Sequence, residues 1–525
     1  MTFKKRLLAI VAACAAPNLA AMAVTVTATN GGGPTPQQLA QNIADGINVT
    51  VVANSAATVI NDGSSTLSSP RSIGTFANGL TTPGTQLPAA NGGSPTVTYA
   101  GGLGVASGVC LSTGVVTNGD IANPSVSGRG IGVEGPNNGI SPPYGGINDT
   151  ASPGEISEQI LGIGIIDADF DEAVFGGLMA TQVPNSGDPV VLQFEVEITS
   201  PGFLSVRTIF GSDEYDQYIE AQYNDSFAIL IKNECTEYEN IAILVDGGMT
   251  KPFTLKAIEE CGAPHFLENQ VAPQPVALPP SPHAIDKNSD GVGDAADGIP
   301  WYDHEFGGFT SLRTWETRCP LAPGIYTIKF VVHDVGDAQV DAGLFIQQNS
   351  LKLFSFLPAD FNLDGTINGN DFLIWQRNFG RVDAKFIDGD ANGDCTVNSA
   401  DLTILTTNWG AAGGNGNYQA DFDRDGDVDS ADLAIWSANF GLQHCASRFE
   451  GDANGDGVVD GSDFLIWQNG YSGATAPLGC GEVEAMRGVG DEATPLDGSE
   501  FDLDNDGEIS LEEAQAWLSE HRIAE

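Results

Sequence analysis

The feature that most constrains this fold is a series of aspartate-rich loops in the last third of the chain. Loops beginning at Asp360, Asp390, Asp421 and Asp452 follow one another at intervals of 30 or 31 residues, and a fifth begins 50 residues later, at Asp502. Self-similarity at a fixed period indicates a repeat array in which each unit packs against a neighbour. The array therefore carries one insertion, before its fifth unit.

Each unit places oxygen-bearing side chains at alternate positions of a twelve-residue loop. Positions 1, 3 and 5 are aspartate or asparagine, position 6 is usually glycine, and position 12 is a carboxylate. Alternate side chains point to one side of such a loop, position 7 offers its carbonyl, and the last carboxylate closes the far side, as a Ca²⁺ loop requires. One such loop could be a solvated turn, but five in register favour calcium. The predicted ligands are Asp360, Asn362, Asp364, Thr366 and Asp371; Asp390, Asn392, Asp394, Thr396 and Asp401; Asp421, Asp423, Asp425, Asp427 and Asp432; Asp452, Asn454, Asp456, Val458 and Asp463; and Asp502, Asp504, Asp506, Glu508 and Glu513.

A short helix is expected after each of the first four loops. Apolar residues recur there at i, i+3 and i+7, and Gly380, Gly410 and Gly441 are placed to end the helices. Such short helices are not stable alone, so we expect the units to fold in pairs around bound metal, with the apolar residues in the core. Position 8 is β-branched in every loop, which predicts a short bridge between two facing loops. The apolar positions are Phe372, Trp375 and Phe379; Leu402, Leu405 and Trp409; Leu433, Trp436 and Phe440; and Phe464, Trp467 and Tyr471.

Upstream of the array, the hydrophobic period changes to two. Buried-face candidates separated by polar residues are Leu192, Phe194, Val196 and Ile198, and Tyr326, Ile328, Phe330 and Val332. Convincing long helical patterns are missing there, so the sequence predicts a β-sandwich. The expected fold class is mainly β, with the sandwich followed by small all-α units of calcium loop and helix.

The N-terminus indicates export. Lys4, Lys5 and Arg6 precede an apolar run, and Ala21–Ala23 forms a small-x-small cleavage site, so residues 1–23 are predicted to be a secretory signal peptide. The mature chain is expected to contain no transmembrane segment and to be secreted, extracellular or at the cell surface. Of the eight cysteines, Cys14 would leave with the signal. The seven that remain are an odd number, which leaves at least one thiol free or paired between molecules.

Charge narrows the classes of partner. The formal net charge of −48 argues against nucleic acids and anionic membrane surfaces, which both require basic patches. Cations are the natural counterpart of such a chain.

The repeats resemble type I dockerin repeats from Asp360 to about Gly473. This resemblance implies calcium-dependent docking to a cohesin-like or cell-surface protein partner, through loop positions 10 and 11 and the helix.

Cys395 replaces the expected glycine at position 6, so the second loop is predicted to be the weakest or most distorted. The fifth copy, which ends at Glu513, looks more like half of an EF-hand. The residues at the docking positions 10 and 11 of the first four loops differ between copies. They are Gly369 and Asn370, Ser399 and Ala400, Ser430 and Ala431, and Gly461 and Ser462.

The upstream region resembles the choice-of-anchor L domain. The motifs that carry this resemblance are, in order, "CLSTGVV" from Cys110, "FGSDEYDQYIEAQYNDSFAILI" from Phe210, "NIAILVDG" from Asn240, "FGGFTSLRTW" from Phe306 and "PGIYTIKFVVHDVGDAQVDAGLFIQQNSL" from Pro323. The family is named for exported proteins that share this domain but differ in their C-terminal sorting devices. Here the repeat array stands where a sorting device would be.

Polar clusters outside the array leave alternatives open. Two clusters stand out in the sandwich: Asp213, Glu214, Asn224 and Asp225, and Asp334, Asp337 and Asp341. Two carboxylates from facing loops could act as the acid and base of a glycosidase, or the clusters could bind a structural calcium or cap turns. A stretch that looks like a thrombospondin type 3 repeat is either a further calcium site or a disordered acidic linker. Its candidate ligands are Asp286, Asn288, Asp290 and Asp297.

The expected organisation has five parts after the signal: a Gly/Ser/Thr/Ala-rich segment at 24–99, a choice-of-anchor L-like sandwich at 100–356 with a Pro/Asp-rich insertion at 262–300, repeat pairs at 357–410 and 411–475, and an EF-hand-like segment at 476–525. The leading hypothesis is an exported, non-enzymatic calcium-binding protein whose repeats dock or anchor a β-sandwich used for adhesion or display. The alternative is a polysaccharide-binding or polysaccharide-degrading protein that the repeats attach.

Overall fold

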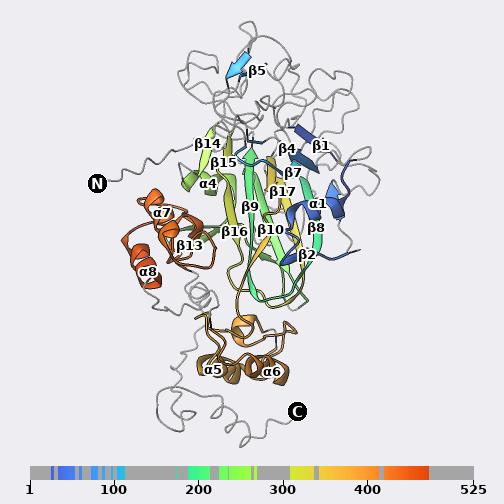
Figure 1. The fold of residues 1–525 in the computed structure, drawn as a ribbon. Helices are drawn as coiled ribbons and strands as arrows, with labels where there is room; N and C mark the ends of the chain where they lie inside the picture. The colour runs from blue at the N-terminus through green and yellow to red at the C-terminus, as the bar shows by residue number, and fades with distance from the viewer. Residues whose placement is uncertain are drawn as a thin grey trace, which may run out of the picture.

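The computed structural model shows a β-domain followed by four loop–helix repeats, which confirms the predicted fold class (Figure 1). It describes residues 25–28, 33–53, 58–61, 73–77, 79–80, 86–88, 96–98, 103–112, 174, 187–212, 224–234, 236–261, 265–268, 308–335, 342–382, 384–412 and 419–471.

Two antiparallel sheets form the β-domain. The larger has nine strands, which are, in spatial order, β1 (Thr25–Ala28), β4 (Ile73–Ala77), β7 (Ser107–Ser112), β18 (Ala342–Gln347), β9 (Gly202–Ser212), β15 (Gly308–Thr310) and β14 (Phe266–Glu268), with β16 (Arg313–Glu316) and β19 (Lys352–Ser355) also paired to β9. The smaller has six, which are β11 (Glu239–Asn240), β10 (Ser226–Lys232), β17 (Gly324–Asp334), β8 (Gly187–Ile198) and β2 (Val49–Val51), with β3 (Thr58–Asn61) also on β8.

Short elements surround the sheets. They are the hairpin β12–β13 (Ile243–Asp246, Met249–Pro252), the pair β5–β6 (Gln86–Pro88, Thr96–Thr98), and the helices α1 (Pro36–Ile43) and α4 (Leu255–Cys261). The Gly/Ser/Thr/Ala-rich segment 24–99 contributes β1, β2, β3 and β4, which all pair with strands of the two sheets. Thr35 caps the start of α1 and forms a capping box with Gln38, and Pro36 is the first residue of the helix. These residues are a recognisable signal for the start of a helix, which the sequence analysis did not use.

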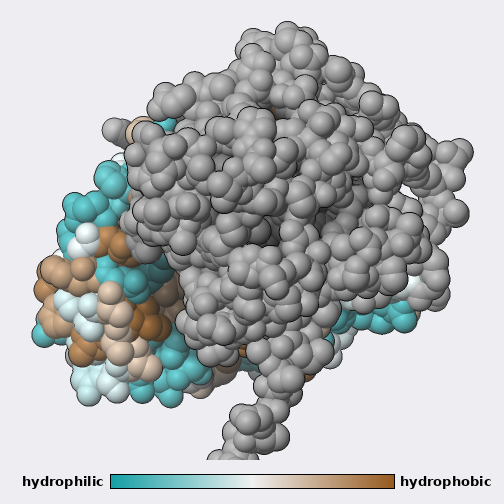
Figure 2. All heavy atoms as spheres, turned by 90° about the horizontal axis from the view of Figure 1, so that it is seen from above, coloured by the Kyte–Doolittle hydropathy of each residue, from teal (hydrophilic) through white to brown (hydrophobic). Residues whose placement is uncertain are grey.

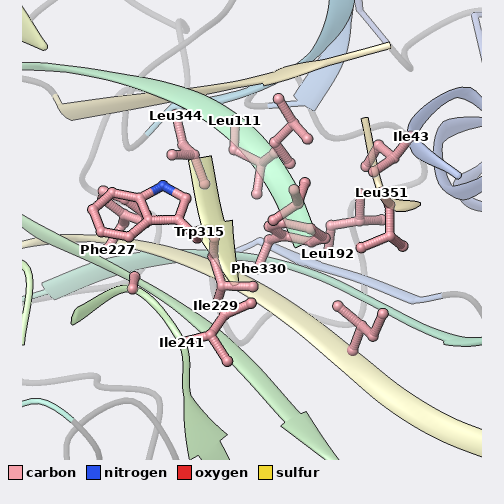
Figure 3. Close-up of a cluster of buried hydrophobic side chains, with 14 of the residues drawn as sticks. Ile43, Leu111, Leu192, Phe227, Ile229, Ile241, Trp315, Phe330, Leu344 and Leu351 are labelled. Atoms are coloured by element: carbon pink, nitrogen blue, oxygen red, sulfur yellow. The ribbon is translucent and has the colours of Figure 1, made fainter. Parts of the chain in front are cut away.

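Side chains from both sheets meet in one hydrophobic core (Figure 3). Leu192 of β8 and Phe330 of β17 face Leu111 of β7 and Leu344 of β18, and Ile43 of α1 lies at the margin of the core. The predicted alternation of β8 and β17 is confirmed, because all eight buried-face candidates are buried. Lys329 departs from the pattern: it occupies a polar position between two core residues and is nevertheless buried, with its Nζ 5.7 Å from the centre of the Tyr238 ring.

Each described loop is followed by a helix, as predicted. The helices are α5 (Gly369–Asn378), α6 (Ser399–Thr407), α7 (Ser430–Asn439) and α8 (Gly461–Tyr471), with single 3₁₀ turns, η3 and η4, at Phe386–Asp388 and Arg448–Glu450. Helix α5 packs with α6, and α7 packs with α8, in two separate hydrophobic clusters. The two pairs lie at different sides of the sandwich, α5–α6 below it and α7–α8 to its left in Figure 1.

The last apolar position of three helices is exposed, which corrects the expectation that every apolar position lies in the core. Phe379, Phe440 and Tyr471 are 41%, 59% and 63% exposed. Phe379 and Phe440 are the C-caps of α5 and α7, so the helical period ends before their side chains can turn back to the core. The first two apolar positions of each helix are buried or partly buried.

In the first, second and fourth loops, the backbone of the β-branched residue at position 8 does not pair with the facing loop, contrary to expectation. Ile367 N donates to Ala411 O (2.9 Å), and Gly410 N donates to Ile367 O (2.8 Å). Position 8 therefore pairs with the residues that follow the partner's helix. The second and fourth loops do the same, through Val397 N to Arg381 O and Val459 N to Leu442 O (both 3.0 Å).

Several predicted features lie outside the described residues: the signal segment 1–23, most of the insertion 262–300 with Asp286–Asp297, and the segment 476–525 with its fifth loop. Among the helices that the structure does describe, none has the length and apolar character to cross a bilayer.

Candidate metal centres

The aspartate at position 12 organises each loop by accepting three backbone N–H groups. Asp371 Oδ1 accepts from Phe361 N (2.8 Å) and Asn362 N (3.3 Å), and its Oδ2 accepts from Asn368 N (2.9 Å). Asp401, Asp432 and Asp463 repeat this pattern in the other loops. The loop is thus closed from its start to the beginning of its helix.

The aspartate at position 1 holds the turn in the middle of the loop. Asp360 Oδ2 accepts from Gly365 N (2.9 Å), and its Oδ1 accepts from Asp364 N (3.1 Å). The equivalent bonds to positions 5 and 6 occur in the other three loops. Positions 1 and 12 therefore each fix a different part of the loop backbone.

Position 9 begins the helix and was missed by the sequence reasoning. Asn368 Oδ1 accepts from Asn370 N (2.7 Å), and Asp371 accepts from Asn368 N, which makes a capping box. Asn398, Asp429 and Asp460 act in the same way. A cap residue followed three positions later by a carboxylate is a recognisable helix-start signal. The position-12 aspartate consequently serves both the loop and the helix.

These aspartates are buried, which is unusual for carboxylates. Positions 1 and 12 of all four described loops are at most 2% exposed. Burial, and next the charge of Asp371, raises the pKa of Asp360 to about 7. Burial likewise raises the pKa of Asp371 and Asp452 to about 7, and that of Asp390 and Asp421 to about 6.

The donor set fits a hard divalent cation. Carboxylate oxygens of Asp421, Asp423 and Asp432 all lie within 4.8 Å of one another in the third loop. A cation between such oxygens would offset both the burial of negative charge and the repulsion within the group. The donors are all oxygen, as Ca²⁺ prefers. Among the described residues, three of the predicted carboxylates come together in this way, Asp421, Asp423 and Asp432 of the third loop. The predicted ligands of the fifth loop and of Asp286–Asp297 lie outside the described residues.

The second loop is not distorted, contrary to expectation. Cys395 adopts φ +71°, close to the +81° of Gly365 at the same position, and Cys395 N donates to Asp390 Oδ2 at 2.9 Å, as Gly365 N does to Asp360. Cys395 is also disulfide-bonded. Its partner is outside the described residues, because Cys110 and Cys319 are free and Cys261 pairs with Cys445.

Tryptophans tie the repeats of each pair together. Trp375 Nε1 donates to Asn398 O (2.9 Å), Trp436 Nε1 to Asp460 O (2.9 Å) and Trp467 Nε1 to Asp429 O (3.0 Å). Each indole reaches position 9 of the partner's loop. The ring fills the core of the pair while its N–H supports the neighbouring helix start.

The helix starts face outward. Of the docking positions that the dockerin resemblance indicated, Gly369 is buried, and the other seven are exposed. Apolar Leu465, Phe440 and Tyr471 are exposed on the second pair, and Figure 2 shows apolar and polar side chains interspersed at its left, where α7 and α8 lie.

The described polar residues of the sandwich have turn roles. Asp225 is fully buried, and its carboxylate accepts from Ser212 Oγ (2.8 Å) and Val335 N (3.2 Å). Asn224 Oδ1 accepts from Lys256 N at the start of α4 (2.9 Å). Asp213, Glu214, Asp337, Asp341 and the side chain of Asp334 lie outside the described residues.

Comparison with known proteins identifies two domains. Residues 96–352 match the choice-of-anchor L domain, and residues 388–439 match the dockerin type I domain. The dockerin match covers the second and third loops, which the structure places in different helix pairs. No curated protein and no solved structure matches the chain. Type I dockerin domains bind calcium. The chain therefore carries a choice-of-anchor L domain, folded as a β-sandwich, followed by a calcium-binding dockerin type I domain.

Proposed function

We propose that this protein is an exported, non-enzymatic, calcium-binding protein whose repeats dock the β-sandwich to a cohesin-like partner on a cell surface or in an extracellular assembly. The observation that carries the proposal is the pair of buried aspartates in each described loop, fixed to the start of an outward-facing helix.

Calcium controls docking in this proposal through the helix starts. Each position-12 aspartate accepts N–H groups from both ends of its loop, so a cation that holds this carboxylate also holds positions 10 and 11, which are exposed except for Gly369. Dockerin domains bind cohesin partners, and both matched domains are structural or docking modules typical of extracellular or cell-surface proteins. Adhesion or display by the sandwich is the finer part of the proposal.

The polysaccharide alternative gains no support from the described residues. Two of the candidate polar side chains of the sandwich, Asn224 and Asp225, hold backbone or hydroxyl groups. We therefore keep polysaccharide binding or degradation as an outcome of the test and not as a second proposal.

The test is capture of cohesin domains, and of exported proteins from the source organism, by the full mature chain with calcium or with chelator. We expect capture in calcium only. Ala400→Arg should weaken binding at the first helix pair and Ala431→Arg at the second, so each variant controls for the other. Equal capture in chelator, or capture of polysaccharide with neither variant reducing it, would move the function to the sandwich.

A further inference from the structure

The calcium loops of the second repeat pair face the sandwich. In the third loop, the Arg424 guanidinium makes two bonds to Glu316 of β16, Nη2 to Oε2 at 2.7 Å and Nε to Oε1 at 3.1 Å. Both side chains are largely buried, at 9% and 13% exposure. Arg424 also lies 5.0 Å from the centre of the Phe354 ring. A residue of a repeat loop thus forms a buried ion pair with a residue of the sandwich.

The fourth loop contacts the β12–β13 hairpin through its backbone. Gly248 N, in the hairpin turn, donates to Asp456 O at 3.0 Å. Gly457, with φ +85°, lies so close to the Val245 carbonyl that a Cβ would clash with it. This approach requires the loop to keep its metal-site conformation, because positions 5 and 6 make the contact and both are held by Asp452.

A buried polar network stands beside these contacts. Arg313 Nη1 can only donate, so His265 Nδ1 accepts (2.7 Å), and His265 Nε2 must then donate to His444 O (3.0 Å). Arg313 Nη2 donates to Cys445 O (2.9 Å), and Cys445 is bonded to Cys261 at the end of α4. The disulfide therefore tethers the repeat pair at the same face.

The interface is not completely packed. A cavity of about 200 Å³ lies between β12, β16 and the segment Ala446–Gly455, with Arg318, Arg448 and Phe449 among its lining residues. A contact with such a void gains less from apolar packing than a protein interior does. Polar contacts made by the loops therefore contribute a larger share of the free energy that holds the repeat pair against the sandwich.

We propose that the sandwich is itself a docking partner, within the same chain, for the loop side of the second repeat pair, and that calcium in the third and fourth loops controls this docking. The hairpin β12–β13 and strand β16 form the receiving surface. Arg424 and the Asp456 carbonyl are positioned by loops that fold with their metal. Loss of calcium releases them, and the Cys261–Cys445 disulfide keeps the released pair attached. The helices α7 and α8 remain outward, so this proposal holds whether or not an external partner binds them.

The Gly248 amide reports docking directly, because its acceptor belongs to the fourth loop. The experiment measures its hydrogen exchange in the full mature chain carrying Cys261→Ser and Cys445→Ser, with calcium and with chelator. We expect protection in calcium and an exchange rate about tenfold higher or more in chelator, while β8 and β17 stay protected. Adding Glu316→Gln should reduce the protection at limiting calcium, whereas the matched control Glu197→Gln, on the exposed side of β8, should not.

Three results would overturn the proposal: protection of Gly248 that persists in chelator, equal behaviour of the Glu316 and Glu197 variants, or simultaneous loss of protection across β8 and β17. If the double serine variant fails to fold, the same measurement on the disulfide-linked parent decides, since Gly248 reaches the loop without passing through the disulfide. No external partner enters this experiment, so its failure is separate from failure of the proposed function.

Discussion

Cys395 combines two opposing effects at a single position. Its left-handed backbone disfavours any residue with a Cβ by roughly 1 kcal/mol, whereas a disulfide typically contributes about 2–4 kcal/mol. The sequence indicated only the first effect, because a glycine was expected there. The structure adds the second, since Cys395 is disulfide-bonded.

We accordingly expect Cys395→Gly to lower the stability of the oxidised protein, and to raise it by about 1 kcal/mol when reductant is present, because only the strain relief then remains. Denaturant unfolding at saturating calcium, with and without reductant, measures both values. A variant that is more stable than the parent under oxidising conditions would show that strain relief at Cys395 outweighs its disulfide.

Asp421 provides a direct test of the third loop. Asp421→Ala should remove one calcium site, because this buried carboxylate also holds Asp425 N and Gly426 N. Asp423→Ala is the matched control: Asp423 is exposed, so we expect a smaller loss of affinity. Titration calorimetry on the mature chain gives the stoichiometry and the affinity. Equal effects of the two substitutions would argue against distinct roles for positions 1 and 3.

At the scale of elements, the helices depend on the loops that precede them. Because Asp371, Asp401, Asp432 and Asp463 are both loop closures and third residues of capping boxes, removing the metal should fray α5 to α8 from their N-termini. We expect the full mature chain to lose helical circular dichroism in chelator and to regain it with calcium, with magnesium a poor substitute. An unchanged spectrum would show that the helices fold without metal.

Because the carboxylate pKa values are raised, an increase in pH should lower the stability of the metal-free repeats and raise their affinity for calcium. The pKa of Asp360, Asp371 and Asp452 is about 7 in the metal-free fold, against an ordinary 3.8. A raised folded-state pKa stabilises the fold most below the ordinary value, so the metal-free repeats should lose this stability as pH rises from about 4 to 7. Calcium binding must displace those protons, so its affinity should rise over the same range.

Calorimetry at about pH 6, in two buffers of different ionisation enthalpy, would count the released protons. We expect release at pH 6 that disappears by about pH 9. Calcium affinity that is independent of pH between these values would show that the carboxylates are already ionised in the metal-free protein.

Local order was predictable because local chemistry determines it. The spacing of Asp360, Asp364 and Asp371 predicted a loop, and the residues after it predicted a helix, which the structure shows. The partner of Ile367 was not predictable, since it depends on how α6 ends and returns to the first loop. The same is true of Arg424: nothing in its neighbourhood indicates that Glu316, 108 positions away, would receive it.

At the scale of the whole molecule, the described residues include a disulfide, Cys261–Cys445, that joins the two domains across 184 residues of sequence. We expect the Cys261→Ser, Cys445→Ser variant to unfold more readily than the parent, by about 2–4 kcal/mol, even in saturating calcium. Cys319→Ser is the control, because Cys319 is a free thiol of intermediate exposure. Calorimetric unfolding compares them, and equal destabilisation by both would mean that the disulfide adds nothing to the native state.

In three of the described loops, the backbone at position 8 pairs with the residues that follow the neighbour's helix, and this pairing limits how such an array can change length. In the first pair, Ile367 bonds beyond α6 and Val397 bonds beyond α5, so each unit supplies the last hydrogen bonds of the other. Deleting one unit in frame would leave an open backbone edge and a tryptophan without its carbonyl acceptor. Duplication or loss of a whole pair, about sixty residues at a time, leaves the bonds within the remaining pairs complete. Related arrays of this kind should therefore differ in length by whole pairs of units.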